Sequence, residues 1–401
     1  MEENKNKILN VPTLRFKNYD DNYREITLKD VCTLITKGTT PAKFSTNGIN
    51  FIKIDSLNGN YVDNSKVTHI NESIHNTLLS RSILEENDIL LAIAGATVGK
   101  HCIIQKSNLP ANTNQALAII RLNKHLLPYY LLAFFDTNYL PSYIKLICAA
   151  SAQPNLNLQQ VGQIKLNIPT IQEQEKVCHF IQLLDKRISV QNKIISDLKV
   201  LKKELCNRYF KSAHNDTSLE YVTLKDILTE RKEYCSKDGT YTHGTLSKEG
   251  VFQKTERYDR DFLVKNEDKQ YKVTHFNDIC YNPANLKFGV ICRNTYGDLI
   301  FSPIYVTFEI ADTVYPAYIE LFLTNANFID RIRRFEQGTV YERMAVSPED
   351  FLSYETRIPT YEEQVKFADK IQRIQDKIEL ETLFLNSLQK QRKYLLNAMF
   401  I

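Results

Sequence analysis

The stretch that decides the fold runs from Ile168 to Phe210 and reads IPTIQEQEKVCHFIQLLDKRISVQNKIISDLKVLKKELCNRYF. Pro169 breaks a preceding strand, and Thr170 can cap the start of a helix. Apolar residues then recur every 3.5 residues, as in the seam of a coiled coil, with no Gly and no further Pro. The seam residues are Val177, Ile181, Leu184, Ile188, Ile195, Leu198, Leu205 and Tyr209, with polar interruptions at Gln191 and Lys202. The pattern predicts one long helix.

A second copy of this stretch lies 190 residues further along the chain. Ile358-Pro359-Thr360 repeats the opening, and polar residues again interrupt the seam at the equivalent positions, Glu381 and Arg392. The second seam is formed by Phe367, Ile371, Ile374, Ile378, Leu385, Leu388, Leu395 and Met399. Two copies with matching interruptions indicate a tandem repeat.

The polar seam positions also predict how the two helices pair. We expect an antiparallel coiled coil in which position k of the first helix faces position 583 − k of the second. This register sets Gln191 against Arg392 and Lys202 against Glu381, because a charge buried against aliphatic side chains costs far more free energy than a paired one. The alternative is that all four side chains lean out to solvent.

The segments outside the helices predict two globular units of mixed α/β structure. Short apolar runs such as 88–94 and 116–122 have the length of buried strands, and 128–147 has a helical pattern that Pro141 interrupts. Short motifs recur between the units, such as Asn87-Asp88-Ile89 and Asn277-Asp278-Ile279, whereas the loops differ. The predicted organisation is an N-terminal arm (1–23), a first globular domain (24–168), a long helix (169–212), a linker (213–218), a second globular domain (219–358) and a second long helix (359–401).

Composition narrows the class of protein. Of the residues, 43% are hydrophobic and 24% charged, which is ordinary for a water-soluble protein, and a net charge of +4 permits nucleic acid as a partner without requiring it. No apolar run is long enough to span a bilayer, and the N-terminus has no signal-peptide pattern. The eight cysteines are scattered without metal-ligand spacing. We expect a cytoplasmic protein that holds no metal.

Catalytic motifs are incomplete. Residues 94–101 resemble a phosphate-binding loop, but Ala94 replaces the first glycine and His101 replaces the final Ser or Thr. Residues 282–285 read NPAN and lack the aromatic residue that would stack on a flipped base. The sequence therefore favours a binding protein over an enzyme.

The loops of both globular domains carry polar and basic side chains suited to nucleic acid. Lysine and arginine bind phosphates, small residues allow close approach, and side-chain amides can pair with adenine edges. In the first domain the candidates are Lys37, Thr39, Thr40, Lys43, Thr97, Lys100, Asn112, Asn114 and Gln115. In the second domain they are His243, Thr245, Lys248, Arg257, Asn282, Lys287, Arg293, Arg331, Arg333, Arg334 and Arg343.

Taken together, the chain resembles the specificity subunits of type I restriction-modification enzymes. The matching motifs are VPTLRF at 11–16, Gln153-Pro154-Asn155 before the first helix, and the two helix openings, IPTIQEQEK and IPTYEEQVK. The resemblance covers about residues 11–400. The second domain has Gly338-Thr339 and Arg343 where the first has Gln153-Pro154-Asn155, which suggests two recognition domains of different subtypes.

The resemblance implies a fold and a division of labour. Each globular unit would be a target recognition domain that reads one half of a bipartite, asymmetric double-stranded DNA site, and the antiparallel helix pair would set the spacing between the halves. Two modification subunits would supply S-adenosylmethionine and methylate adenine. Restriction subunits would supply ATP-driven translocation and cleavage, with Mg, so this chain would hold no cofactor. The alternatives are a coiled-coil scaffold that binds only proteins and a self-contained DNA-modifying enzyme with an unrecognised site.

Overall fold

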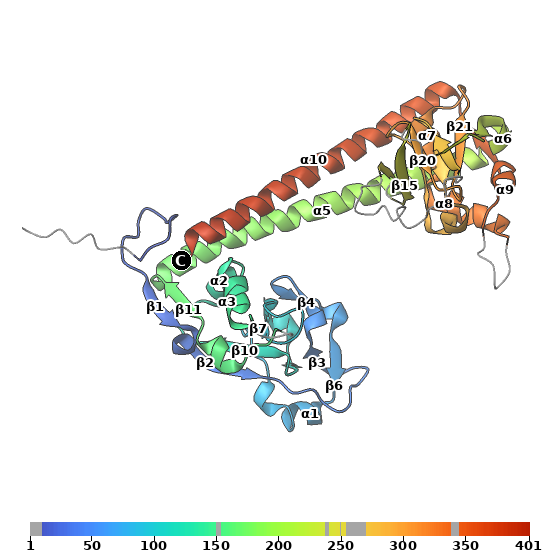
Figure 1. The fold of residues 1–401 in the computed structure, drawn as a ribbon. Coiled ribbons are helices and arrows are strands. Elements are labelled where there is room, and N and C mark those ends of the chain that lie inside the picture. The colour runs from blue at the N-terminus through green and yellow to red at the C-terminus, as the bar shows by residue number, and fades with distance from the viewer. Residues whose placement is uncertain (1–9, 150–153, 237–239, 249, 254–269, 338–344) are drawn as a thin grey trace, which may run out of the picture. The chain divides into compact units, whose positions relative to one another are not determined.

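The computed structural model describes residues 10–149, 154–236, 240–248, 250–253, 270–337 and 345–401. It divides into two compact units. Unit 1 comprises residues 1–192 and 383–401, and unit 2 comprises residues 193–382. Each unit therefore contains one globular domain together with part of each long helix, as the labels in Figure 1 allow the reader to follow.

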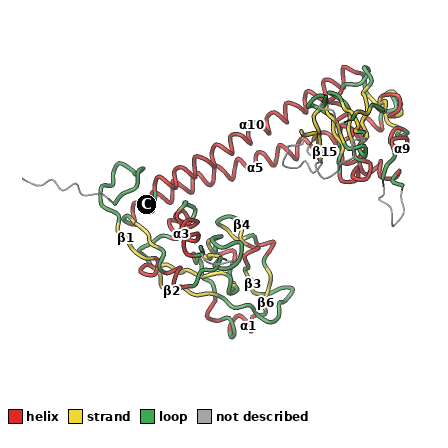
Figure 2. Tube along the Cα trace, in the orientation of Figure 1, coloured by secondary structure: helices red, strands yellow, loops and turns green. Residues whose placement is uncertain are grey.

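The two long helices are α5, Ile171–Asn215, and α10, Tyr361–Met399, which are drawn red in Figure 2. Every predicted apolar seam position is buried or half-buried, which confirms the seam. In unit 1 the helices are antiparallel, because Val177 shares a core with Met399 while Asp185, further along α5, pairs with Arg392. In unit 2 the same holds, since Tyr209 stacks on Phe367 at 3.6 Å between ring centroids, while Lys202, earlier on α5, binds Gln375, later on α10.

The predicted register of the helices is wrong. Lys202 donates to Oε1 of Gln375 at 2.9 Å, and Gln375 lies six residues before Glu381, the expected partner. Glu381 pairs instead with Lys377, one turn away on its own helix. Arg392 pairs with Asp185, six residues before Gln191. The polar seam residues are nevertheless inside the interface, and Gln191 is only 5% exposed, so they do not lean out to solvent.

Unit 1 is built on a four-stranded sheet in the order β2-β10-β7-β8, whose inward side chains form its main core with α2 and α3. A second sheet has the order β6-β3-β9, and β1 pairs with β11 at the entrance to α5. The break in the predicted helix lies before Pro141, which sits in the first turn of α3. The strands are β1 (Arg24–Thr27), β2 (Cys32–Lys37), β3 (Ile49–Ile52), β4 (Leu57–Asn58), β5 (Tyr61–Val62), β6 (Thr68–Ile70), β7 (Ile89–Ala92), β8 (His101–Ile103), β9 (Ala111–Thr113), β10 (Leu117–Leu122) and β11 (Lys165–Ile168). The shorter α-helices are α1 (Glu72–Asn76), α2 (Pro128–Phe135), α3 (Tyr139–Ile147) and α4 (Leu158–Gly162).

Unit 2 has the same four-stranded sheet and the same strand pair before its long helix, which together we call the frame, but its second sheet differs. Its four-stranded sheet has the order β13-β21-β18-β19, which is the same arrangement, and β12 pairs with β22 before α10. Within the described residues its second sheet has five strands, β14-β17-β20-β15-β16, where the second sheet of unit 1 has three. The strands are β12 (Glu220–Thr223), β13 (Leu228–Glu230), β14 (Tyr234–Cys235), β15 (Thr242–Ser247), β16 (Gly250–Gln253), β17 (Tyr271–Thr274), β18 (Ile279–Tyr281), β19 (Ile291–Arg293), β20 (Leu299–Phe301), β21 (Val306–Ile310) and β22 (Glu355–Ile358). The shorter α-helices are α6 (Leu224–Ile227), α7 (Pro316–Leu323), α8 (Ala326–Ile332) and α9 (Pro348–Leu352).

The short motifs that recur between the units have structural roles. Asn87 and Asn277 both adopt a left-handed conformation, with φ of 72° and 73°, which asparagine tolerates better than most residues. The aspartate that follows each of them is almost fully buried and pairs with an arginine, Asp88 with Arg121 and Asp278 with Arg231. The repetition of these motifs therefore reflects a shared turn and a shared buried ion pair.

A buried glutamine joins each globular domain to its long helix. The Oε1 atom of Gln174 accepts from the backbone N–H of Leu127, just before α2, and its Nε2 donates to the carbonyl of Pro169, just before α5. Gln364 makes the same two contacts, to Tyr315 before α7 and Pro359 before α10. Both glutamines are at most 1% exposed. The motif that opens each helix thus also fixes the domain beside it.

A charged network makes a second joint in unit 1. Asp136, at the end of α2, accepts from Arg392 at 2.7 Å, from His101 at 3.1 Å and from Asn60 at 3.0 Å. Burial alone would raise the pKa of the Asp136 carboxyl, but the His101 and Asn60 hydrogen bonds and the Arg392 charge lower it to about 2. The network ties the globular domain to both helices, because Arg392 also binds Asp185 on α5.

We predict that Gln174→Leu lowers the free energy of unfolding by about 1–3 kcal/mol, because the Leu127 N–H loses its partner inside the protein. Gln172→Leu is the matched control, since Gln172 is exposed on the same turn of α5. Urea denaturation of both variants measures the difference. Equal midpoints for the two would show that the buried amide does not hold the joint.

The low pKa of Asp136 predicts how the free energy of unfolding depends on pH. A carboxyl whose pKa falls from 3.8 to about 2 on folding contributes stability above pH 3.8 and loses it as the pH falls toward 2. Asp136→Asn should therefore cost roughly 2 kcal/mol at neutral pH, and the difference from the wild type should shrink below about pH 4. Asp197→Asn, which breaks only the exposed pair with Lys193, should change stability little. A pH-independent difference would contradict the assignment.

Candidate nucleic-acid interface

The register of the four-stranded sheet brings separate loops to one end of unit 1. Ala118 of β10 pairs with Lys37 of β2 on one side and Leu91 of β7 on the other, and Leu91 pairs with His101 of β8. The chain therefore leaves β2 and β7, and enters β8 and β10, at the same end of the sheet. We call the residues there, 38–43, 93–100 and 114–116, the loop end of unit 1.

The first loop is held against the third by close backbone contact. A Cβ atom at Gly38 would lie 1.7 Å from the carbonyl oxygen of Thr113, so only glycine fits this approach. Gln115 accepts from the N–H and the hydroxyl of Thr40 at 3.1 and 2.6 Å. Arg81 donates to the Thr39 hydroxyl at 3.0 Å. The candidates Lys37, Thr39, Thr40, Lys43, Asn114 and Gln115 are thereby brought together on a largely exposed surface.

The second loop joins this end through the motif before the long helix. The N–H of Gly95 donates to the carbonyl of Pro154 at 3.2 Å, and Ala94 bridges to Asn155. Thr97 and Lys100 lie in the same loop, and Lys100 is exposed. The described part of the Gln153-Pro154-Asn155 motif therefore lies against the candidate loops, whereas Gln153 is outside the described residues.

Asn112 is a wrong candidate. Its side chain is fully buried, contacts the His75 ring and donates to the carbonyl of Leu79 at 3.0 Å. It serves the interior between β9 and α1 and cannot reach a base edge. The sequence could not distinguish it from Asn114, because both stand in the same short polar run.

Unit 2 presents the equivalent end of its sheet, where residues 282–290 connect β18 to β19, and we call these residues the loop end of unit 2. The 3-10 helix η8, Pro283–Phe288, follows β18 there and carries Lys287, with the ring of Phe288 62% exposed beside it. Asn282 is 7% exposed and accepts from the N–H of Ala284, so it caps η8 and is not available for DNA. Lys248 reaches the same end, since its Cε lies 3.7 Å from the place of a Cβ on Gly289.

The other candidate residues of unit 2 do not all lie at its loop end. Arg293 lies at the opposite end of the sheet and binds Glu320 at 3.0 Å and Asn277 at 2.7 Å, which contradicts its place on the interface. His243 and Thr245 lie on β15, with Thr245 exposed. Arg257 and Arg343 lie outside the described residues.

The arginine cluster lies on a helix that touches the loop end of unit 2. Arg331 is in α8, which packs against η8, and Arg333 and Arg334 follow in the 3-10 helix η9, Arg333–Phe335. Both Arg333 and Arg334 are exposed, and Arg333 lies 3.8 Å from Glu336. Their placement is compatible with phosphate contacts.

Sequence reasoning missed Arg81 and Phe288. Arg81 joins the loop end only through folding, because it is 42 residues from Thr39, the residue it contacts. Phe288 carried a signal, an aromatic residue next to a lysine and a glycine in a polar turn, which suits stacking on a base.

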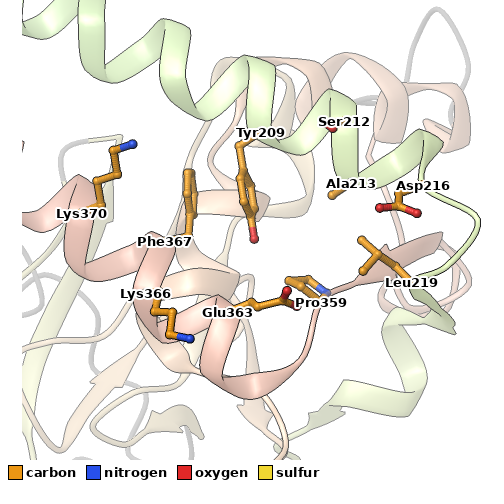
Figure 3. A pocket seen from close by; sticks show the side chains of 10 residues that line it. All are labelled: Tyr209, Ser212, Ala213, Asp216, Leu219, Pro359, Glu363, Lys366, Phe367 and Lys370. Atoms are coloured by element: carbon orange, nitrogen blue, oxygen red, sulfur yellow. The ribbon is translucent and has the colours of Figure 1, made fainter.

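The described surface of unit 2 also carries a groove that lies away from its loop end. Figure 3 shows a groove of unit 2 near the end of α5, in which Tyr209 stacks on Phe367 and two lysines, Lys366 and Lys370, share the walls with Glu363 and Asp216. Over the described ranges, no cluster of three or more His, Cys, Asp or Glu side chains could bind a metal ion. In the same residues no helix is long and apolar enough to cross a membrane.

Comparison with known proteins identifies a matching family model and similar sequences. Residues 20–200 match the family model described as the type I restriction modification DNA specificity domain. A putative type I restriction enzyme MjaX specificity subunit of Methanocaldococcus jannaschii is 20% identical over 93% of this chain and 91% of its own length. The type I restriction enzyme EcoBI specificity subunit of Escherichia coli is 26% identical over 34% of this chain and 28% of its own length.

Solved structures share the fold. The S subunit of a type I restriction-modification system from M. genitalium superposes with a TM-score of 0.53 at 13% identity, covering 98% of this chain and 99% of that one. A chain from a structural study of complex assembly in a type I system gives a TM-score of 0.61, also at 13% identity, over 94% and 96%. The fold of this chain is thus a known one.

We predict that replacing Arg331, Arg333 and Arg334 with Gln weakens binding to every DNA sequence and flattens the dependence of log K on log salt, by up to about 0.9 for each phosphate that is no longer bound. The matched control neutralises Lys366, Lys370 and Arg373, which are exposed on α10 of the same unit. Titrations at several salt concentrations measure both slopes. A slope equal to that of the wild type would remove the arginine cluster from the interface.

Proposed function

We propose that this chain is a type I restriction-modification specificity subunit whose two domains each read one half of a bipartite, asymmetric DNA target, because residues 20–200 match the model of the DNA specificity domain and a specificity subunit is similar to this chain over 93% of its length. In this role the chain is a non-catalytic recognition subunit of a larger enzyme. The observation that carries the proposal is the contrast between the units: the same four-stranded frame bears a three-stranded second sheet in unit 1 and a five-stranded one in unit 2. Different surfaces on one frame suit different half-sites.

The loop ends supply the chemistry that such reading needs. In unit 1, Lys37, Lys43 and Lys100 can bind phosphates, while Asn114 and Gln115 offer amides to base edges in the major groove. In unit 2, Lys287 and Lys248 can bind phosphates beside the exposed ring of Phe288. The two sets share no residue pattern, which supports two unlike half-sites.

The long helices are the proposed docking surface for the modification subunits and the element that sets half-site spacing. Large apolar side chains remain exposed on them in both units. In unit 1 these include Leu183, Val190, Leu383 and Tyr394, and in unit 2 Val200, Leu201 and Leu380. Apolar groups gathered along a helix outside its own seam are typical of a surface that a partner helix covers. The docked modification subunits would bring S-adenosylmethionine, restriction subunits would bring ATP and Mg, and the assembly would work in the cytoplasm.

The two halves of the target should change independently. Replacing residues 24–165 with the matching domain of a relative should change one half of the methylated motif and leave the other half and the spacing intact, because the frame and helices are kept. Methylome sequencing of cells that express the parent or the hybrid chain with its modification subunits reads both halves at once. A change in both halves would show that the domains do not read independently.

Two other functions are tested in the same system. Transfer of a labelled methyl group to DNA by the purified chain alone would indicate a self-contained modifying enzyme. A complex with modification subunits that shifts no DNA would indicate a scaffold that binds only proteins. The proposal expects DNA binding in the complex and no transfer by the chain alone.

A further inference from the structure

A basic cleft lies in unit 2 between α5 and the globular domain. It has a volume of about 520 Å³, and none of the described residues that line it is acidic. Its basic residues are Lys199, Lys202, Lys203 and Lys248. The neutral residues Asn207, Thr324 and Gln375 form other parts of the wall, and Asn207 accepts from Asn325 at 3.0 Å.

At the equivalent position in unit 1, carboxylates balance the positive charge of the long helix. Lys202 is the repeat equivalent of Arg392, and Gln375 is the equivalent of Asp185, each at a separation of 190 residues. In unit 1, Arg392 binds Asp185 and also Asp136 at the end of α2. In unit 2, Lys202 binds the uncharged Gln375, and Thr324 stands at the end of α7 where Asp136 stands at the end of α2.

The two joints are equivalent in position but differ in charge. Two carboxylates balance one guanidinium in unit 1, whereas no carboxylate of the described lining residues faces the ammonium of Lys202 in unit 2. Three further lysines share this cleft. Like charges gathered in a concave site repel each other and attract an anion, because the field is focused between protein walls. The joint of unit 2 is therefore suited to an anionic ligand.

The position of Lys248 indicates which anion. Its side chain runs from the cleft to Gly289, in the turn between η8 and β19 at the loop end of unit 2. Lys248 thus belongs both to the cleft and to the surface proposed to read DNA. We propose that this cleft binds a backbone phosphate of the DNA at the edge of the half-site that unit 2 reads. The inference rests on the proposed function and adds a phosphate site formed in part by the long helix.

The sharpest test transplants the neutral joint of unit 1 into unit 2. Gln375→Asp with Thr324→Asp removes no cation and places carboxylates beside Lys202, as in unit 1. We expect the complex of the full chain with its modification subunits to bind its target roughly tenfold more weakly at moderate salt, with a salt slope reduced by about 0.9–1.8. Gln375→Asn with Thr324→Ser is the matched control, which keeps the polarity without the charge and should bind as the wild type does.

A second pair of variants tests whether lysines in the cleft affect DNA binding more than lysines elsewhere on unit 2. Lys199→Gln with Lys203→Gln, two lining residues that lie outside the loop end, should weaken binding and lower the slope in the same way. Lys366→Gln with Lys370→Gln should not, because those lysines line the groove of Figure 3, where Glu363 and Asp216 already balance them. Thermal unfolding of each complex identifies any variant that fails to fold, and the other pair then decides.

The outcomes distinguish this inference from the proposed function. Suppose that the wild-type complex binds its target DNA and that both cleft variants keep the wild-type affinity and the wild-type dependence of log K on log salt. The cleft then holds no phosphate, and this inference is wrong while the proposed function stands. If the cleft variants instead lose the modification subunits while the DNA slope is unchanged, the occupant is an acidic protein segment and the inference is overturned. If the wild-type complex binds no DNA, the proposed function itself fails.

Discussion

The structure depends on one buried amide that occurs twice. Gln174 and Gln364 each bridge the backbone before a long helix and the backbone before the first helix of a globular domain. An amide can do this because it offers an acceptor and a donor in one plane, and inside the protein each unmade bond would cost about 1–3 kcal/mol. A carboxylate of the same shape could accept but not donate. The geometry between domain and helix is therefore set by a residue that tolerates little change.

This fixed joint leaves the far end of each sheet free to vary. The shared turns at Asn87 and Asn277 and the buried pairs of Asp88 and Asp278 lie at the sheet end away from the loops, where the frame is repeated. The second sheets and the loop ends, by contrast, differ between the units in strand number and residue type. Recognition surfaces can diverge in this way without loss of stability, because the energy that holds the frame together comes from contacts they do not share.

The sequence predicted the parts of the fold that rest on local pattern. The seams, the long helices, the core strands β7 and β10 and the break before Pro141 all follow from periodicity and proline geometry. The register of the helices could not be predicted, because Arg392 is positioned by Asp136, a residue from a third element. Two of the site candidates were wrong for a related reason: Asn112 and Asn282 have the right chemistry, but tertiary packing turns both inward.

The observed register shows how the contact between the two long helices can differ in charge between the two units. Polar residues in a coiled-coil seam can fix alignment by pairing with each other, and that assumption led to Lys202 against Glu381. Here two of the four polar residues pair instead with the flank of the opposite helix, Arg392 with Asp185 and Lys202 with Gln375. Such a contact keeps its geometry whether the partner is charged or neutral, since a carboxylate and an amide both present an acceptor oxygen. The joint can therefore change its net charge without changing its shape, which allows one copy to remain purely structural while the other keeps its cations for a ligand.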